Sequence, residues 1–313
     1  MKELLRFTPV IKKTVWGGRR LAQEFHYCAD SDGIGECWGI SAHPHGDCVV
    51  AQGRFQGMKL SQLYREHREL FGNLQSPDFP LLVKIIDAEK KLSIQVHPHD
   101  EYARLHENGS QGKTECWYVM DCPEKAELII GHHARTREQL EMMIREGRYE
   151  ELIRRVSVHK GDFIRINPGT IHSITEAMLI LEIQQNSDIT YRVYDYERLV
   201  NGQPRALHVE QSIAVTNVPD QSDKENIMQA GALSKNMIHQ LIDCAYFRVY
   251  KLEINRKYLM KMKAPFIQIS VLSGMGTIDG KKLEKGDHII LPNGYDEAEF
   301  DGELEMILSA PIG

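Results

Sequence analysis

The chain has 313 residues, of which 42% are hydrophobic and 26% are charged, the balance of a folded globular protein. Its formal net charge of -6 provides no basic surface for nucleic acid, although a few local Lys or Arg residues can still bind an anionic ligand. No run approaches 18 consecutive apolar residues, the six cysteines form no CxxC pair, and the N-terminus lacks the apolar core of a signal peptide. We therefore expect a cytoplasmic protein that binds neither nucleic acid nor membranes.

Most of the chain consists of short β-rich runs bounded by Gly, Pro and Asp, which is typical of an all-β sandwich or barrel. The clearest runs are Leu81–Ile86, Leu92–Val96, Ala126–Ile130, Asp162–Ile166, Leu179–Gln184, Phe266–Leu272 and His288–Leu291. Helical spacing of apolar residues is found in Leu60–Phe71 and in Thr136–Val156, where Thr136 and Gln139 resemble a capping box. We expect Thr136–Val156 to be a helical hairpin inserted between two strands.

Two segments of the sequence resemble each other without gaps. Val158–Ile174 and Leu283–Glu299 both contain Lys-Gly-Asp, an apolar strand and a turn rich in Pro, Asn and Gly. This echo predicts two copies of one β-module, and the polar segment Pro219–Lys235 is a plausible linker or long loop between them. We expect a catalytic domain at 1–235 with helical insertions and a C-terminal β-domain at 236–313. Because His172 in the first copy corresponds to Glu297 in the second, only the first copy is expected to bind a metal.

Candidate metal ligands occur in three of the predicted strands. In Ile94–Asp100, strand alternation turns Gln95, His97 and His99 to one face. Glu115 precedes an apolar run, and a buried carboxylate needs a cation or a proton. His172 follows the Pro168-Gly169 turn. Each motif alone also fits a structural role without a metal, such as a solvated strand end or a surface ion pair between Glu115 and Lys113. Together they form a mixed N/O ligand set that suits zinc, with iron or manganese as alternatives.

The four motifs LSIQVHPHD, GKTECWYV, INPGTIHSI and NSDITYRVYDYER occur in an order and spacing that resemble the type I mannose-6-phosphate isomerases, in their short bacterial form. The resemblance covers nearly the whole chain and implies a mainly β fold with two cupin-like barrel or jelly-roll modules. It implies that Gln95, His97, Glu115 and His172 bind one zinc ion per chain. It also implies that Arg192 is the essential active-site arginine and that Lys113 and Asp188 line the sugar-phosphate pocket.

The implied reaction is the interconversion of mannose 6-phosphate and fructose 6-phosphate through an enediol or enediolate. Such a reaction needs a base, an acid and stabilisation of negative charge on oxygen, for which a metal ion and the fork of Arg192 are suited. The residues alone leave the base open between Asp188, Lys113 and a zinc-bound water. They also allow a purely structural role for Arg192, in a surface ion pair with Asp195 or Glu197. Two rival functions are a metal-dependent cupin oxygenase and a sugar-phosphate-binding cupin without catalysis, and the presence of Lys113, Asp188 and Arg192 together argues against both.

Overall fold

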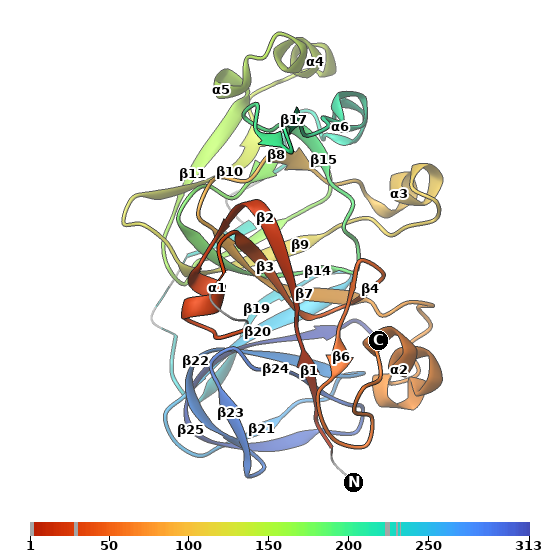
Figure 1. Cartoon of the computed structure of the whole chain (residues 1–313), viewed down its shortest axis with the longest axis vertical. Coiled ribbons are helices and arrows are strands. Elements are labelled where there is room, and N and C mark those ends of the chain that lie inside the picture. Colours follow the sequence, from red (N-terminus) through yellow and green to blue (C-terminus); the bar gives the residue numbers. More distant parts are fainter. Residues whose placement is uncertain (1–2, 28–30, 223–225, 230, 232) are drawn as a thin grey trace.

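The protein is described by a computed structural model that covers residues 3–27, 31–222, 226–229, 231 and 233–313. Most of its regular structure is β, as predicted, and the strands in this part of the chain build three large sheets stacked along the long axis of the molecule (Figure 1). None of the described strand pairings closes one of these sheets into a complete barrel. No described helix is long and apolar enough to cross a membrane.

The upper sheet has the strand order β11-β10-β13-β8-β15 and lies at the top of Figure 1. Its strands are antiparallel and bring together segments that are far apart in the sequence, so that His172 on β13 lies directly opposite Gln95 on β8. The bounds are Ile94–Val96 for β8, Ala126–His132 for β10, Ile153–Val158 for β11, His172–Ser173 for β13 and Tyr191–Tyr194 for β15.

The middle sheet has the order β18-β12-β9-β14-β7-β2-β3. Its central strands β7 and β14 are buried along their whole length, because the sheet is covered on both faces. The bounds are Val10–Gly18 for β2, Ile34–Ile40 for β3, Leu81–Ala88 for β7, Glu115–Asp121 for β9, Phe163–Ile166 for β12, Met178–Gln185 for β14 and Ile227–Met228 for β18.

The lower sheet has the order β19-β20-β25-β22-β24-β1-β6, with β21 paired to β25 and β23 paired to β22. Its last two strands come from the N-terminal part of the chain: Leu5 on β1 pairs with Ile290 on β24. The bounds are Leu5–Thr8 for β1, Val49–Val50 for β6, Met237–Asp243 for β19, Phe247–Ile254 for β20, Tyr258–Lys261 for β21, Ile267–Ile278 for β22, Lys281–Glu284 for β23, His288–Leu291 for β24 and Glu297–Pro311 for β25.

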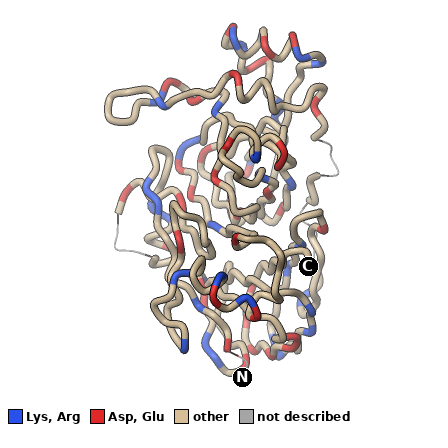
Figure 2. Tube along the Cα trace, turned by 90° about the vertical axis from the view of Figure 1, so that its right-hand side faces the viewer, with Lys and Arg blue, Asp and Glu red and all other residues tan. Residues whose placement is uncertain are grey.

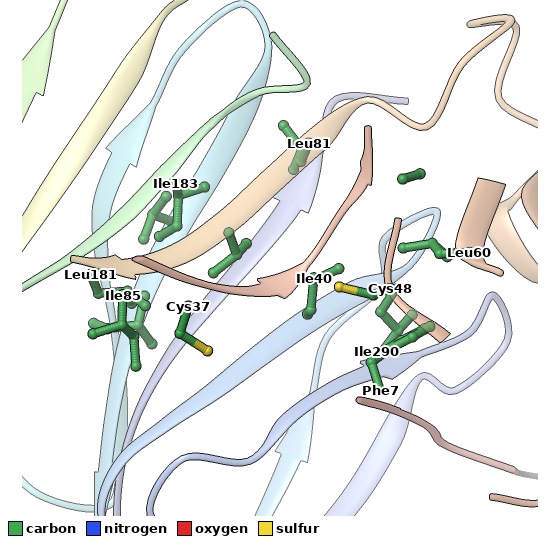
Figure 3. Packing of buried hydrophobic residues seen from close by; sticks show 14 of the residues in the cluster. Phe7, Cys37, Ile40, Cys48, Leu60, Leu81, Ile85, Leu181, Ile183 and Ile290 are labelled. Carbon is green, nitrogen blue, oxygen red and sulfur yellow. The ribbon is translucent and has the colours of Figure 1, made fainter. Parts of the chain in front are cut away.

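The largest hydrophobic core lies between the middle and lower sheets. Figure 3 shows Ile85 and Cys37 of the middle sheet in the same layer as Phe7 and Ile290 of the lower sheet, and all four side chains are buried. A second core lies between the middle and upper sheets, where Trp117 and Ile180 pack with Ile130. The middle sheet is thus packed on both faces, which is why its strands are almost continuously apolar.

The helices cover the ends of the sheets. Thr136 accepts a hydrogen bond from the backbone N–H of Gln139 at 3.2 Å, which confirms the predicted N-terminal cap of α4. The predicted helical hairpin is present as α4 and α5 but ends at Leu152, and the prediction is wrong from Ile153 to Val156, because Ile153–Val158 is strand β11 in the upper sheet. The β-branched residues Ile153, Val156 and Val158 favour a strand, and pairing with β10 outweighs the helical spacing. The bounds are Arg20–Gln23 for α1, Leu60–Glu66 for α2, Asp100–His106 for α3, Arg137–Arg145 for α4, Tyr149–Leu152 for α5 and Val209–Val215 for α6, with a 3-10 turn at Arg68–Phe71 and short hairpins β4–β5 (Ala42–His43, Gly46–Asp47) and β16–β17 (Leu199–Val200, Gln203–Pro204).

The two echoing segments have the same turns. Gly161 and Gly286 have φ of +91° and +92°, and Gly169 and Gly294 both have φ of +80°, a region that glycine adopts without strain. Gly161 and Gly169 flank strand β12, and Gly286 and Gly294 flank strand β24 in the same way. The segment Pro219–Lys235 is largely irregular where it is described, apart from β18, which pairs with β12; residues 223–225, 230 and 232 of this predicted linker lie outside the described residues.

Charged residues of one sign form no continuous stripe in the part of the chain that the structure describes. Figure 2 shows acidic and basic positions interleaved along the trace.

Candidate metal centre

Four polar side chains meet between the upper and middle sheets. Gln95 lies on β8 and His172 begins β13, both in the upper sheet, and His97 directly follows β8. Glu115 is the first residue of β9 in the middle sheet. His97, Glu115 and His172 are at most 1% exposed, so the packing of the two sheets places three potential ligands away from solvent.

The three buried side chains present their donor atoms to one another. The two Nε2 atoms of His97 and His172 are 3.1 Å apart, and the Glu115 carboxylate oxygens lie 3.5 Å from His97 Nε2 and 3.4 Å from His172 Nε2. Ligand atoms held tetrahedrally at zinc distances of about 2.0–2.1 Å are about 3.3 Å apart. The observed spacings therefore fit a single zinc-sized ion enclosed by this set.

Both imidazoles are oriented by the backbone. His97 Nδ1 donates to the carbonyl of Ile189 at 2.7 Å, and His172 Nδ1 donates to the carbonyl of Thr170 at 2.8 Å. With the proton on Nδ1, each Nε2 carries a lone pair directed into the centre, which is the usual arrangement of metal-binding histidines. Burial lowers the pKa of His172 to about 4, and burial together with Lys113 lowers the pKa of His97 well below its ordinary value. Both rings are thus neutral near pH 7, as metal ligation requires.

Glu115 lacks a full set of partners. Burial and the nearby Glu182 raise the pKa of the Glu115 carboxyl. Its Oε2 lies 2.8 Å from Lys113 Nζ, while Oε1 finds no hydrogen-bond partner among the described residues. An orphaned, buried carboxylate oxygen facing two imidazole lone pairs fits a divalent cation well.

Gln95 is placed to complete the set. Its side-chain amide lies 3.3 Å from His172 Nε2, and Ser93 Oγ donates to the other end of the amide at 3.3 Å. Because the nitrogen and oxygen of a glutamine amide are assigned from their partners, the amide can also present its oxygen to an ion at this point. Gln95 therefore lies beside the three buried ligands, within reach of the same centre.

A cavity of about 160 Å³ lies over the metal centre and opens between the two sheets. Gln95 and Lys113 line it and also contact the buried ligands, so they link the cavity to the metal centre. Its further lining residues with charged or hydroxyl side chains are Thr14, Glu36, Lys84, Ser93, Glu182, Thr190, Arg192 and Arg205.

Lys84 and Glu182 form a buried ion pair in the cavity wall that was not predicted from the sequence. They are direct cross-strand partners on β7 and β14, with Nζ and Oε2 2.7 Å apart, and Trp117 Nε1 donates to Glu182 Oε1 at 2.8 Å. Burial alone would raise the pKa of Glu182, but Lys84, Lys113 and the hydrogen bond from Trp117 together outweigh burial and lower it. The signal was present in the sequence: LLVKIIDA places Lys84, and LILEIQQ places Glu182, between apolar neighbours in a strand, and a charge in such a position needs a buried partner.

Arg192 enters the same cavity without an anionic partner. Among the described residues, no carboxylate lies within ion-pair distance of Arg192, and its buried Nε has no hydrogen-bond partner. Asp195 instead accepts two hydrogen bonds from Arg205, each of 2.6 Å, and also pairs with Arg198. Burial, with Arg205 nearby, lowers the pKa of Arg192. The alternative in which Arg192 is neutralised by Asp195 or Glu197 is therefore not what the structure contains.

Asp188 and His99 lie elsewhere. Asp188 faces a neighbouring cavity, where its carboxylate contacts His43 and His45. His99 caps α3 by accepting a hydrogen bond from the backbone N–H of Tyr102 at 3.3 Å. The structure thus brings together Gln95, His97, Glu115, His172, Lys113 and Arg192, and it does not bring Asp188 to the wall of this cavity.

Known proteins share both the sequence and the architecture of this chain. Residues 4–131 match the type I phosphomannose isomerase catalytic domain, and residues 237–311 match the mannose-6-phosphate isomerase cupin domain. The chain is 46% identical to mannose-6-phosphate isomerase ManA of Bacillus subtilis over 312 residues, 98% of either chain. The chain belongs to the type I phosphomannose isomerase family.

Two further relatives support this membership. A mannose-6-phosphate isomerase of Streptococcus mutans is 45% identical over 314 residues, covering 99% of this chain and 98% of the relative. The crystal structure of the mannose 6-phosphate isomerase from Bacillus subtilis superposes with a TM-score of 0.93 at 42% identity, covering 98% of this chain and 99% of that one. Sequence and fold thus place the whole chain among the phosphomannose isomerases.

Proposed function

We propose that this chain interconverts mannose 6-phosphate and fructose 6-phosphate in a zinc-dependent reaction that proceeds through an enediolate. The observation that carries the proposal is the buried His97–Glu115–His172 set beneath a cavity into which the unpaired Arg192 projects. A metal position beside an uncompensated cation is suited to substrates that carry negative charge and develop more of it on oxygen during reaction.

His97, Glu115 and His172 would hold the zinc ion, one per chain, with Gln95 as fourth ligand. When bound, the ion supplies Lewis-acid polarisation of substrate oxygens. The fit rests on the donor spacing, on the neutral imidazoles and on the orphaned Glu115 oxygen described above.

Arg192 would stabilise the negative charge of the enediolate. Its guanidinium is permanently charged, is not neutralised by Asp195, and can make two parallel hydrogen bonds to oxygen atoms of the substrate. Because the fold holds this charge in place before substrate binds, little reorganisation is needed in the transition state.

Lys113 would move the proton between C1 and C2: its free amine takes the proton from one carbon, and the ammonium so formed returns it to the other. Of the two protein groups that the sequence offered for this step, Lys113 lines the cavity, whereas Asp188 faces the neighbouring one. Lys113 Nζ is 2.8 Å from Glu115 Oε2 and 3.2 Å from His97 Nε2, so its position is fixed by the metal ligands.

The remaining parts of the prediction belong to the same proposal. We infer a catalytic domain at 1–235 and a metal-free cupin domain at 236–313, together forming two cupin-like modules; the repeated glycine turns support this division. We also infer a cytoplasmic enzyme whose partner is a small sugar phosphate.

A coupled assay tests the function directly. Purified chain is incubated with mannose 6-phosphate. Excess glucose-6-phosphate isomerase converts the fructose 6-phosphate formed to glucose 6-phosphate, and glucose-6-phosphate dehydrogenase then oxidises it while reducing a nicotinamide cofactor, whose absorbance is followed. The proposal predicts turnover in the parent and its loss in Lys113→Gln with zinc content retained. A parent loaded with zinc that produces no fructose 6-phosphate would refute the function, and would favour a binding protein instead.

A further inference from the structure

Asp188 lies in a cluster whose role the proposed reaction does not explain. Its Oδ1 is 3.3 Å from His43 Nε2, and its Oδ2 makes a short contact with His45 Nδ1. Both histidines come from the β4–β5 hairpin, in which they flank Pro44. His43 is largely shielded from solvent and packs edge-on against Trp38, whereas the His45 side chain is 71% exposed.

The hydrogen bonds favour a proton between His43 and Asp188 over a metal ion. The backbone N–H of His45 donates to His43 Nδ1 at 3.2 Å, so the neutral His43 ring carries its proton on Nε2, toward the carboxylate. A metal ligand at Nε2 would need that proton moved to Nδ1, where it would face an N–H group. The cluster is therefore best described as a carboxylate clamped by two imidazole donors.

The clamped carboxylate belongs to the loop that orients a metal ligand. Residues 186–190 connect β14 to β15, and the carbonyl of Ile189, next to Asp188, accepts the 2.7 Å hydrogen bond from His97 Nδ1. At its start the loop is fixed by a 3.0 Å hydrogen bond from Asn186 N–H to the Pro80 carbonyl. Near the Ile189 carbonyl, the contacts of the Asp188 side chain with His43 and His45 attach the loop to the β4–β5 hairpin.

We propose that Asp188 is a positioning residue for the metal centre. Through His43 and His45 it holds the Ile189 carbonyl where that carbonyl fixes the tautomer and rotation of His97. Asp188 thus acts through the backbone on a metal ligand, and not on the sugar. This inference rests on the proposed metal site at His97.

Zinc affinity tests this role without relying on turnover. The dissociation constant of the metal-stripped chain is measured by competition with a chromophoric chelator, and the folded state is checked by circular dichroism. Loss of an outer partner of a metal-bound histidine typically weakens binding about 10- to 100-fold. We expect an effect of this size for Asp188→Ala, and less than about threefold for His43→Gln, whose amide can still donate to Asp188. Asp243→Ala removes an exposed aspartate paired with Arg248 and should bind zinc like the parent.

A double-mutant cycle gives a second, independent measurement. His43→Ala should also weaken zinc binding, and His43→Ala combined with Asp188→Ala should be no worse than Asp188→Ala alone, because both changes remove the same attachment. Fully additive losses would overturn the shared role.

The outcomes separate this inference from the proposed function. Unchanged zinc affinity in folded Asp188→Ala, with lower turnover at saturating zinc, would show that Asp188 acts on the substrate and would overturn the inference. His97→Ala serves as the reference: if it too left zinc affinity unchanged, the metal site itself would be wrong. A strong loss in His97→Ala but none in Asp188→Ala refutes only the positioning role.

Discussion

Arg192 and Arg198 offer a paired test of which arginine serves catalysis. Arg198 donates to Asp195 and to the Lys91 carbonyl, and its side chain is 17% exposed. Arg192 lines the cavity and has no carboxylate partner within the described residues. The two neighbours therefore differ in the way that separates a structural ion pair from a charge reserved for the substrate.

Arg192→Ala should lower kcat by about 10²-fold or more, with KM changed little, because the lost charge interacts mainly with the transition state. Such a change corresponds to about 2.7 kcal/mol of transition-state stabilisation. The melting temperature should stay the same or rise slightly, since Arg192 lies near Arg198 and Arg205 and its removal relieves repulsion. Arg192→Lys should recover only part of the activity, because an ammonium group cannot make the two-pronged contact.

Arg198→Ala should give the opposite result. Hydrogen bonds to charged groups contribute about 1.5–3 kcal/mol to stability, so we expect a loss of about 1–2 kcal/mol for this partly exposed side chain, with kcat close to that of the parent. Steady-state kinetics and thermal denaturation of both variants decide the matter. If Arg192→Ala turned over normally and melted at a lower temperature, the catalytic assignment would be wrong. A large rise in KM with weaker inhibition by inorganic phosphate would instead assign Arg192 to the phosphate group.

Three further predictions follow from the buried groups. Glu115→Gln should weaken zinc binding strongly, measured by dialysis and metal analysis, because it removes the ligand charge and leaves a neutral amide between two imidazoles. Lys84→Met should destabilise the fold by about 3–5 kcal/mol in denaturant unfolding, because the Glu182 carboxylate then stays buried without its cation; a loss below about 1 kcal/mol would refute this. Burial lowers the pKa of His288 to about 4 from an ordinary 6.5, so the neutral ring is favoured in the folded state, and stability is full above about pH 6.5 and falls as the pH drops toward 4. The maximum loss is about 3 kcal/mol, and between pH 6.5 and 4 the stability of His288→Gln should fall by about that much less than the stability of the parent; an equal fall in both proteins would contradict this.

The sequence predicted those features that depend on local pattern. All seven of the strand runs correspond to strands in the structure, because alternation and flanking turn residues are local signals. The ligands His97, Glu115 and His172 converge as expected, since each lies at the end of a strand entering the same space. The spacing of Leu152, Ile153 and Val156 led to the wrong prediction of a helix up to Val156. Three apolar residues fit a helix face as well as a strand, and only pairing with β10 decides between the two.

Long-range pairing could not be predicted. Nothing near Leu5 in the sequence indicates that it pairs with Ile290, because that contact forms only when the lower sheet assembles. The separation of Asp188 from Arg192 has a similar cause. Both belong to one motif, but Asp188 lies in the loop before β15 and Arg192 on the strand itself, so they face different cavities. Which side a loop residue faces depends on partners such as His43, which the motif does not contain.

A zinc titration tests the central claim most directly. The chain is stripped of metal with a chelator, exchanged into metal-free buffer and titrated with zinc while the conversion of mannose 6-phosphate to fructose 6-phosphate is followed. One metal centre at His97, Glu115 and His172 predicts that turnover rises from near zero and reaches its plateau at one equivalent of zinc per chain. Full turnover in the stripped chain, or a plateau only at two equivalents, would contradict this account.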